Sequence, residues 1–165
     1  MTISVRLLMA MAMLCSAVVA NELHPPSASE IEARTARGIA AMRAEAEARH
    51  LNGVAVIAFF EGDSPKGWVS HMAVVGSLRN SPPAGDQVAN LLAIAYQKAG
   101  ESADSLKDSG KAGRKLLVGE TGWGGSRIKP APGGHWVAAF SGGKDSDDQL
   151  VSDAGIESAM REVSK

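Results

Sequence analysis

The sequence predicts an α+β domain built on an antiparallel sheet. An apolar, β-branched run at 54–60 is followed, after a turn, by a second strand-like run at 68–76. Helix patterns precede and follow this pair, and a late strand-like run leads directly into a closing helix. The 165 residues suffice for one domain with a buried core, and no internal repeat divides them.

The first helix is expected from Ser29 to about His50. This stretch is rich in alanine, and its apolar residues recur on one face. Ser27 and Glu30 have the spacing of a capping box at its start, and Asn52-Gly53 ends it.

A β-hairpin follows the first helix. The run VAVIAFF (54–60) is apolar throughout, as expected for a central strand, and EGDSPKG (61–67) has the composition of a turn. WVSHMAVVG (68–76) is then expected to return antiparallel to the first strand.

The middle of the chain predicts helices. Within 86–99, apolar residues fall at the helical spacing i, i+3, i+4, i+7 and i+11, namely Val88, Leu91, Leu92, Ala95 and Ala99. ESADSLKDSG is a second and weaker helix candidate, ending at Gly110.

The last third returns to strands and closes with a helix. The segment 111–134 is rich in glycine and proline and is expected to hold two short strands, at 115–118 and 126–130. HWVAAFSG predicts a further strand, and 146–163 predicts the final helix.

The N-terminus reads as a secretory signal peptide. Arg6 precedes an unbroken apolar run from Leu7 to Cys15, and small residues close the segment at Ala20. We therefore expect residues 1–20 to be cleaved near Ala20, residues 21–28 to form a flexible leader and residues 29–165 to form the domain. The mature protein would be periplasmic or secreted. It would have no cysteine, because Cys15 is the only one.

Composition narrows the function classes. Hydrophobic residues make up 45% of the chain and charged residues 21%, which is ordinary for a folded domain. The formal net charge of -1 gives no basic face, so we expect no nucleic-acid partner.

The stretch SGGKDS (141–146) admits two interpretations. Glycines between a strand and a helix can cradle phosphate, as in the ATP pyrophosphatases. Those enzymes carry the motif on their first strand, however, whereas here only 19 residues follow Ser146. The alternative is a packing turn whose following acids favour the start of the helix.

The histidines do not form a zinc motif. None of the four is spaced i, i+4 from another, and neither HxH nor HExxH occurs. His71 lies in the middle of a predicted strand, and His135 begins another beside Trp136.

Several stretches together resemble the GlcG/HbpS-like family of small haem-binding, sometimes haem-degrading, domains. FSGGKDSDDQLVSDAGIESAM is similar to that family's last strand, glycine turn and closing helix. AYQKAGESA is similar to its lysine-alanine helix, and GGSRIKPAPGG to its glycine-flanked strand. The turn after the first strand departs from the family pattern, with Glu61-Gly62-Asp63 at altered spacing.

The resemblance implies an α-β-α sandwich around a five-stranded antiparallel sheet, in a chain that forms homo-oligomers. Exported members of the family bind haem or iron, and some signal to a membrane sensor protein. The resemblance therefore implies an exported binding protein for haem or another small apolar ligand with an acid group. We expect His71 or His135 as the axial ligand, with Trp136, Trp68 or Phe140 lining the ligand face.

Other functions stay open at this point. The chain could be an enzyme acting on haem or on a small hydroxy acid, or an ATP pyrophosphatase that uses the SGGKDS loop. It could also be a scaffolding oligomer that binds no ligand.

Overall fold

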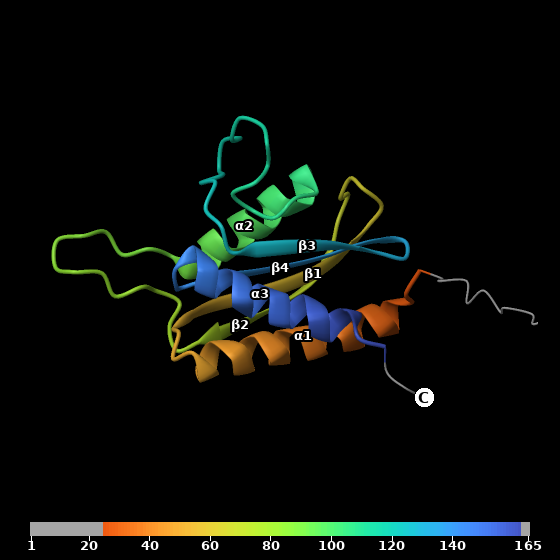
Figure 1. Cartoon of the computed structure of the whole chain (residues 1–165), viewed down its shortest axis with the longest axis horizontal. Coiled ribbons are helices and arrows are strands. Elements are labelled where there is room, and N and C mark those ends of the chain that lie inside the picture. The colour runs from red at the N-terminus through yellow and green to blue at the C-terminus, as the bar shows by residue number, and fades with distance from the viewer. Residues whose placement is uncertain (1–24, 163–165) are drawn as a thin grey trace, which may run out of the picture.

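The apolar strands pair into one antiparallel sheet in the order β2-β1-β4-β3, with helices on both of its faces (Figure 1). A computed structural model describes residues 25–162. Its elements are, in chain order, α1 (Ala28–Ala48), β1 (Gly53–Glu61), β2 (Val69–Val75), α2 (Leu91–Ser105), β3 (Ser126–Ala131), β4 (Gly134–Ser141) and α3 (Asp145–Met160).

The predicted signal peptide, residues 1–20, lies outside the described residues, as does the first half of the predicted leader, residues 21–24. Among the helices within 25–162, none is long and apolar enough to cross a bilayer.

The predicted α-β-α layering is confirmed by the two sides of the core. On one face of the sheet, α1 and α3 cover a cluster that includes Ile57, Trp136 and Phe140. On the other face, α2 covers Phe60, Val137 and the neighbouring apolar residues. Because both faces are covered, β1 is buried from Gly53 to Phe60, which explains its uninterrupted apolar sequence.

Glycines allow α1 and α3 to lie close together on their side of the sheet. A Cβ placed on Gly38 of α1 would overlap Ile57 and lie 3.0 Å from the carbonyl oxygen of Gly155 on α3. A Cβ on Gly155 would lie 2.7 Å from the sulfur of Met42. These two positions fix the distance between the helices.

The helix ends confirm one expectation and correct two. The predicted capping box of Ser27 and Glu30 is present at the start of α1. The second helix begins at Leu91 rather than at position 86, because the Asn90 side chain caps it by accepting from the Ala93 N–H. Residues 77–90 form a long loop that projects from the body (Figure 1). The two helices predicted between 86 and 110 are one, which ends at Leu106 in the left-handed conformation.

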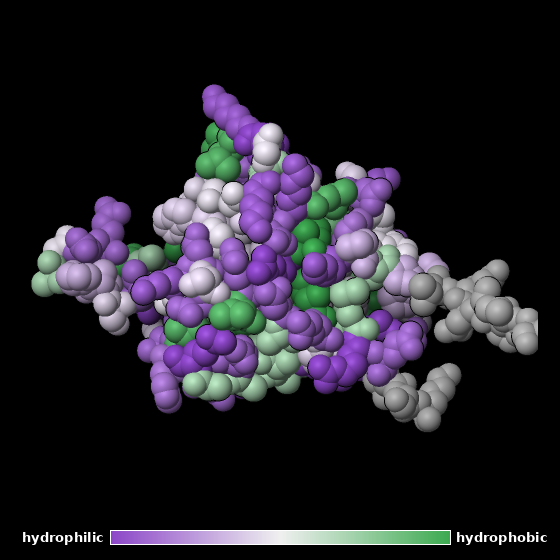
Figure 2. Space-filling model, in the orientation of Figure 1, coloured by the Kyte–Doolittle hydropathy of each residue, from purple (hydrophilic) through white to green (hydrophobic). Residues whose placement is uncertain are grey.

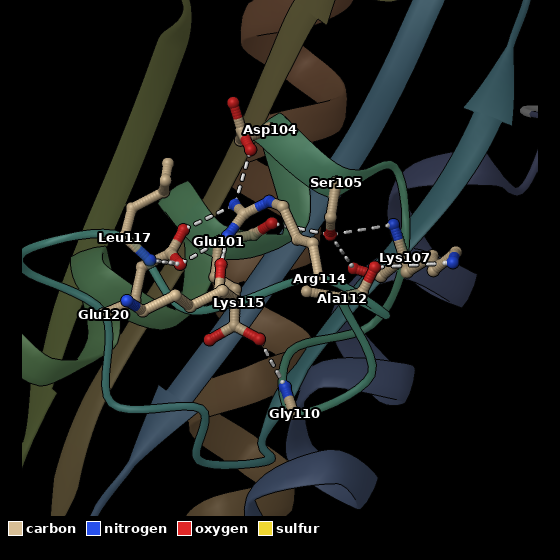
Figure 3. Close-up of polar contacts among 10 residues, drawn as sticks. All are labelled: Glu101, Asp104, Ser105, Lys107, Gly110, Ala112, Arg114, Lys115, Leu117 and Glu120. Carbon is tan, nitrogen blue, oxygen red and sulfur yellow. Dashed lines mark hydrogen bonds and ion pairs between the residues drawn. The ribbon is translucent and has the colours of Figure 1, made fainter.

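The fifth strand predicted at 115–118 is wrong, and the sheet has four strands rather than five. These residues form an exposed turn that is tied to its own loop instead of to the sheet (Figure 3). The carboxylate of Glu120 accepts from the Leu117 N–H at 2.7 Å and pairs with the guanidinium of Arg114 at 2.7 Å. The Leu117 N–H is thus bonded within the turn, and Gly119 has a positive φ that a strand does not use.

A buried ion pair joins the two helical layers around one end of the sheet. Lys98 of α2 and Asp148 of α3 are both buried, and their charged atoms lie 2.7 Å apart. The Lys98 ammonium also donates to the Phe140 carbonyl at 3.2 Å, and Asp148 accepts from the Gly143 N–H at 2.8 Å. Burial raises the pKa of the Asp148 carboxyl, while the lysine opposes that rise.

Removing one partner of this pair should destabilise the fold strongly. Lys98→Met leaves the Asp148 carboxylate buried without its cation, so we expect the free energy of unfolding in urea to fall by about 3–5 kcal/mol. The double variant Lys98→Met/Asp148→Leu should recover most of that loss, because no unpaired charge is left buried.

Arg43→Met is the matched control, since Arg43 pairs with Glu47 at 3.6 Å on the exposed surface. We expect it to change the free energy of unfolding by less than about 1 kcal/mol. A Lys98→Met variant as stable as the Arg43→Met variant would show that the buried pair does not hold the layers together.

The loop around Glu120 should loosen only in strong acid. The hydrogen bonds from Arg114 lower the pKa of Glu120 from its ordinary value of 4.5 to about 2. Since the pKa in the folded loop is the lower one, the stabilisation is present above the ordinary pKa and is lost as the pH falls toward the folded value. Hydrogen exchange at the Leu117 amide, corrected for the intrinsic rate, should therefore show protection that fades between those two pH values.

Glu120→Gln should remove this protection already at neutral pH, whereas Glu47→Gln on α1 should leave it unchanged. Equal protection of the Leu117 amide in wild type and Glu120→Gln would contradict this account of the loop.

Candidate functional site

The SGGKDS turn has one of its N–H groups, and one of a neighbouring loop, bonded to carboxylates of the same chain. The Gly143 N–H donates to Asp148, and the Gly124 N–H of a neighbouring loop donates to Asp145 at 3.0 Å. A Cβ on Gly142 would overlap the backbone of Asn52, so the glycine is required by close packing. The geometry favours the packing turn over the phosphate loop, because side-chain carboxylates already sit where a phosphate would bind.

A cleft opens at the other end of the sheet, beside the β1–β2 hairpin. Its volume is about 750 Å³. The apolar residues that line it come from α1, from both hairpin strands and from the position just before β2: Ile31, Phe59, Phe60, Val69 and Trp68. Its polar lining comes from the turn between the strands: Glu61, Asp63, Ser64 and Lys66. Figure 2 shows apolar surface where this hairpin projects, next to polar residues.

A smaller hollow continues the cleft toward α2. It measures about 350 Å³ and shares Lys66, Gly67 and Trp68 with the larger cleft. Its far side is formed by the last turns of α2, at Gly100, Ala103 and Asp104. The indole of Trp68 also packs against Tyr96, with ring centroids 6.2 Å apart. The two hollows thus form a site with one anchored aromatic wall.

His135 lies behind the hairpin turn, at the edge of the larger cleft. Its ring stacks on Phe60 with centroids 5.3 Å apart, and its Nδ1 lies 3.0 Å from the Gly62 carbonyl oxygen. A carbonyl only accepts, so Nδ1 carries the proton and a neutral ring keeps a lone pair on Nε2. That Nε2 lies 3.8 Å from Asp63, a residue of the cleft lining. A backbone carbonyl that fixes the tautomer is a usual arrangement for a metal-binding histidine.

His71 lies on the opposite face of the sheet. It pairs in register with Ile57, whose side chain belongs to the α1–α3 side of the core, whereas His135 pairs with Phe60 on the α2 side. The Nε2 of His71 lies 2.9 Å from the Glu32 carboxylate of α1. The structure therefore does not bring the two histidines together, and they cannot bind one ligand atom jointly. Within 25–162, no group of three or more acidic, histidine or cysteine side chains is placed to hold a metal ion.

Trp136 is a core residue in this structure. Its side chain has no exposed surface and packs on Phe59 with ring centroids 5.1 Å apart. Phe140 is equally buried in the same cluster. A ligand could touch either ring only if the core opened, whereas Trp68 lines the cleft directly.

Sequence reasoning missed the polar residues of the cleft. Asp63 and Lys66 lie in EGDSPKG, which predicts only a turn. The signal that could have found them is the pair of aromatic residues that flank the turn, Phe60 and Trp68. A short polar turn between two aromatic residues places polar side chains beside apolar ones, as a small-molecule site requires. The buried Lys98 was also signalled, as a lysine on the apolar face that follows Leu91 and Ala95.

No known protein family matches the sequence, and no curated protein is similar to it in sequence. Solved structures are similar in fold. A crystal structure of HbpS aligns with a TM-score of 0.54 at 15% identity, over 82% of this chain and 93% of that one. A double mutant of Streptomyces reticuli HbpS aligns at 0.54 and 13% identity, over 94% of this chain and 97% of that one. The Klebsiella pneumoniae protein ORFY aligns at 0.51 and 14% identity, over 77% of this chain and 88% of that one.

These neighbours support the resemblance to the GlcG/HbpS-like family that the C-terminal stretch carries. At such low identity the likeness is one of fold.

The glycine turn should not process ATP. The carboxylates of Asp145, Asp147 and Asp148 already occupy the positive end of the α3 dipole, so we expect their like charge to repel a polyphosphate. Incubation with ATP and magnesium should release no pyrophosphate above a protein-free blank. Release that disappears in Lys144→Ala would overturn the packing interpretation of this turn.

Proposed function

We propose that the chain is an exported binding protein that holds a small, largely apolar ligand in the cleft at the β1–β2 hairpin, and that this ligand is haem. The observation that carries the proposal is the cleft itself. Its volume of about 750 Å³ falls within the range of small-molecule sites, which is roughly 300–1,000 Å³.

The lining suits a flat apolar ligand with acidic groups. Trp68 and the exposed Val69 supply the accessible apolar surface, Phe59 and Phe60 lie buried behind them, and Lys66 is the cation of the lining. Haem combines an apolar macrocycle with two carboxylates, so Trp68 fits the ring and Lys66 fits a carboxylate. Iron would take its axial ligand from the protein, and it supplies the redox or oxygen chemistry of the bound group.

His135 fits the axial ligand better than His71. Its proton is held on Nδ1 by the Gly62 carbonyl, and its Nε2 points to the cleft residue Asp63. His71 has its Nε2 against Glu32 of α1. Neither histidine is itself part of the cleft lining, but His135 contacts the lining residues Gly62 and Asp63. The proposal therefore assigns the ligand role to His135.

Export and partners are further parts of the proposal. The N-terminal sequence, with Arg6, the apolar run and Ala20, supports secretion or a periplasmic location. The fold shared with HbpS is compatible with a homo-oligomer and with signalling to a membrane sensor protein, as the family resemblance implies.

The test is a haemin titration followed by absorbance. Wild-type protein should give a sharpened, shifted Soret band. His135→Ala removes the axial ligand itself, so it should weaken binding by at least the roughly 10–100-fold that loss of a ligand's outer-shell partner costs. His71→Ala is the matched control, since it removes an imidazole from the opposite face, and it should leave the titration unchanged.

Two results would count against the proposal. A wild-type protein that leaves the haemin spectrum unchanged would remove haem as the ligand. A loss confined to His71→Ala would move the site to the other face of the sheet. Trp68→Ala should lower affinity without changing the axial-ligand spectrum, because it removes wall area alone.

A further inference from the structure

The loop between α2 and β3 presents an apolar tip to solvent. Leu117 is 52% exposed, Trp123 is 51% exposed and Val118 is fully exposed, with Leu116 beside them. Figure 2 shows apolar surface next to a long polar side chain where this loop stands above α2. Three consecutive large apolar residues that project in this way are unusual on a soluble domain surface.

The tip is held in place rather than loose. Arg114 forms ion pairs with Glu120 and with Asp104 of α2, and Glu120 also binds the Leu117 N–H (Figure 3). The Gln97 side chain donates to the Gly119 carbonyl from the middle of α2. Internal polar contacts therefore fix the backbone of the turn while its apolar side chains point outward.

The loop itself carries more cations than acids: within 107–123, Lys107, Lys111, Arg114 and Lys115 outnumber Asp108 and Glu120. The acidic residues of this loop and Asp104 at the end of α2 share two arginines. Asp104 and Glu120 both pair with Arg114, and Asp108 pairs with Arg127, which also pairs with Asp153. Lys107, Lys111 and Lys115 are exposed. Of these, only Lys111 has an acidic partner in the described part of the chain, at 3.6 Å with its side chain 62% exposed.

We propose that this loop, residues 107–123, docks the protein on an anionic lipid surface, with Leu117, Val118 and Trp123 inserted shallowly. Exposed aliphatic residues with an adjacent tryptophan match the interfacial region of a bilayer, and lysines attract anionic headgroups. A convex tip inserts into a fluid lipid layer without needing a shaped partner. The charge complementarity therefore favours lipid over a protein groove.

The docking loop lies next to the ligand site. Asp104 pairs with Arg114 at the base of the loop and also lines the smaller hollow that continues the cleft. Docking through the tip would bring this hollow toward the lipid surface. The inference goes beyond the proposed haem binding, and its test does not involve haem.

The test uses the chain from Asn21 onward, which keeps every described helix and strand and omits the apolar segment 1–20. Wild-type protein should co-sediment with vesicles of equal parts phosphatidylcholine and phosphatidylglycerol and only weakly with phosphatidylcholine alone. Leu117→Ser/Val118→Ser should lower the partition coefficient by about tenfold or more, since two buried aliphatic side chains are lost. Lys111→Gln/Lys115→Gln should lower it about fivefold per lysine on the anionic vesicles.

Leu150→Ser is the matched control, because Leu150 is 44% exposed but lies on α3 in the opposite layer. Leu150→Ser should bind vesicles like wild type. In a separate measurement, brominated lipid should quench the tryptophan fluorescence of wild type more than that of Trp123→Phe. All variants should unfold at the wild-type temperature, because the changed side chains are exposed.

Equal binding by the tip variant and wild type, or no binding to anionic vesicles, would overturn the proposal. A third result would also overturn it: light scattering shows that wild type self-associates and the tip variant does not, while neither protein binds vesicles. The tip would then contact a second copy of the chain.

Discussion

The arrangement of layers depends on the buried contact between Lys98 and Asp148. The two residues belong to helices on opposite faces of the sheet, and they meet where β4 ends. Because neither charge is stable in the core alone, α2 and α3 must pack in positions that bring the two side chains together. The ion pair also requires a glycine at position 125, because a Cβ there would lie 2.7 Å from the Lys98 ammonium and 2.8 Å from the Cβ of Asp148.

The buried ion pair joins the helical layers at one end of the sheet, and the cleft lies at the other end. β1 and β4 run antiparallel, so Val54 lies opposite Ser141 near the ion pair, whereas Glu61 lies opposite Gly134 near the hairpin turn. At the hairpin end no buried pair joins the layers within 25–162, and aromatic residues meet a polar turn instead. The buried ion pair and the cleft thereby lie at different ends of the same two strands.

Local patterns predicted most of the fold because most elements leave a direct mark on the sequence. The capping box at Ser27 has a short-range cause, whereas the apolar run of β1 and the glycine at 142 record tertiary packing that only those residue types allow. The failed strand at 115–118 has the composition of one, but its polar contacts are with Arg114 and Glu120. The cleft could not be predicted because it joins Ile31, Trp68 and the hairpin turn, whose proximity depends on the register of the whole sheet.

One helix links the three features that matter for function. Lys98, Glu101 and Asp104 follow one another at a spacing of three along α2, so they lie near one face. Lys98 closes the core, Glu101 accepts from the Gly110 N–H at 2.7 Å, and Asp104 pairs with Arg114 at the base of the apolar tip. Since Asp104 also lines the smaller hollow, a shift of α2 would move core, loop and site together. The buried pair at Lys98 therefore sets the position from which both the cleft wall and the docking loop are built.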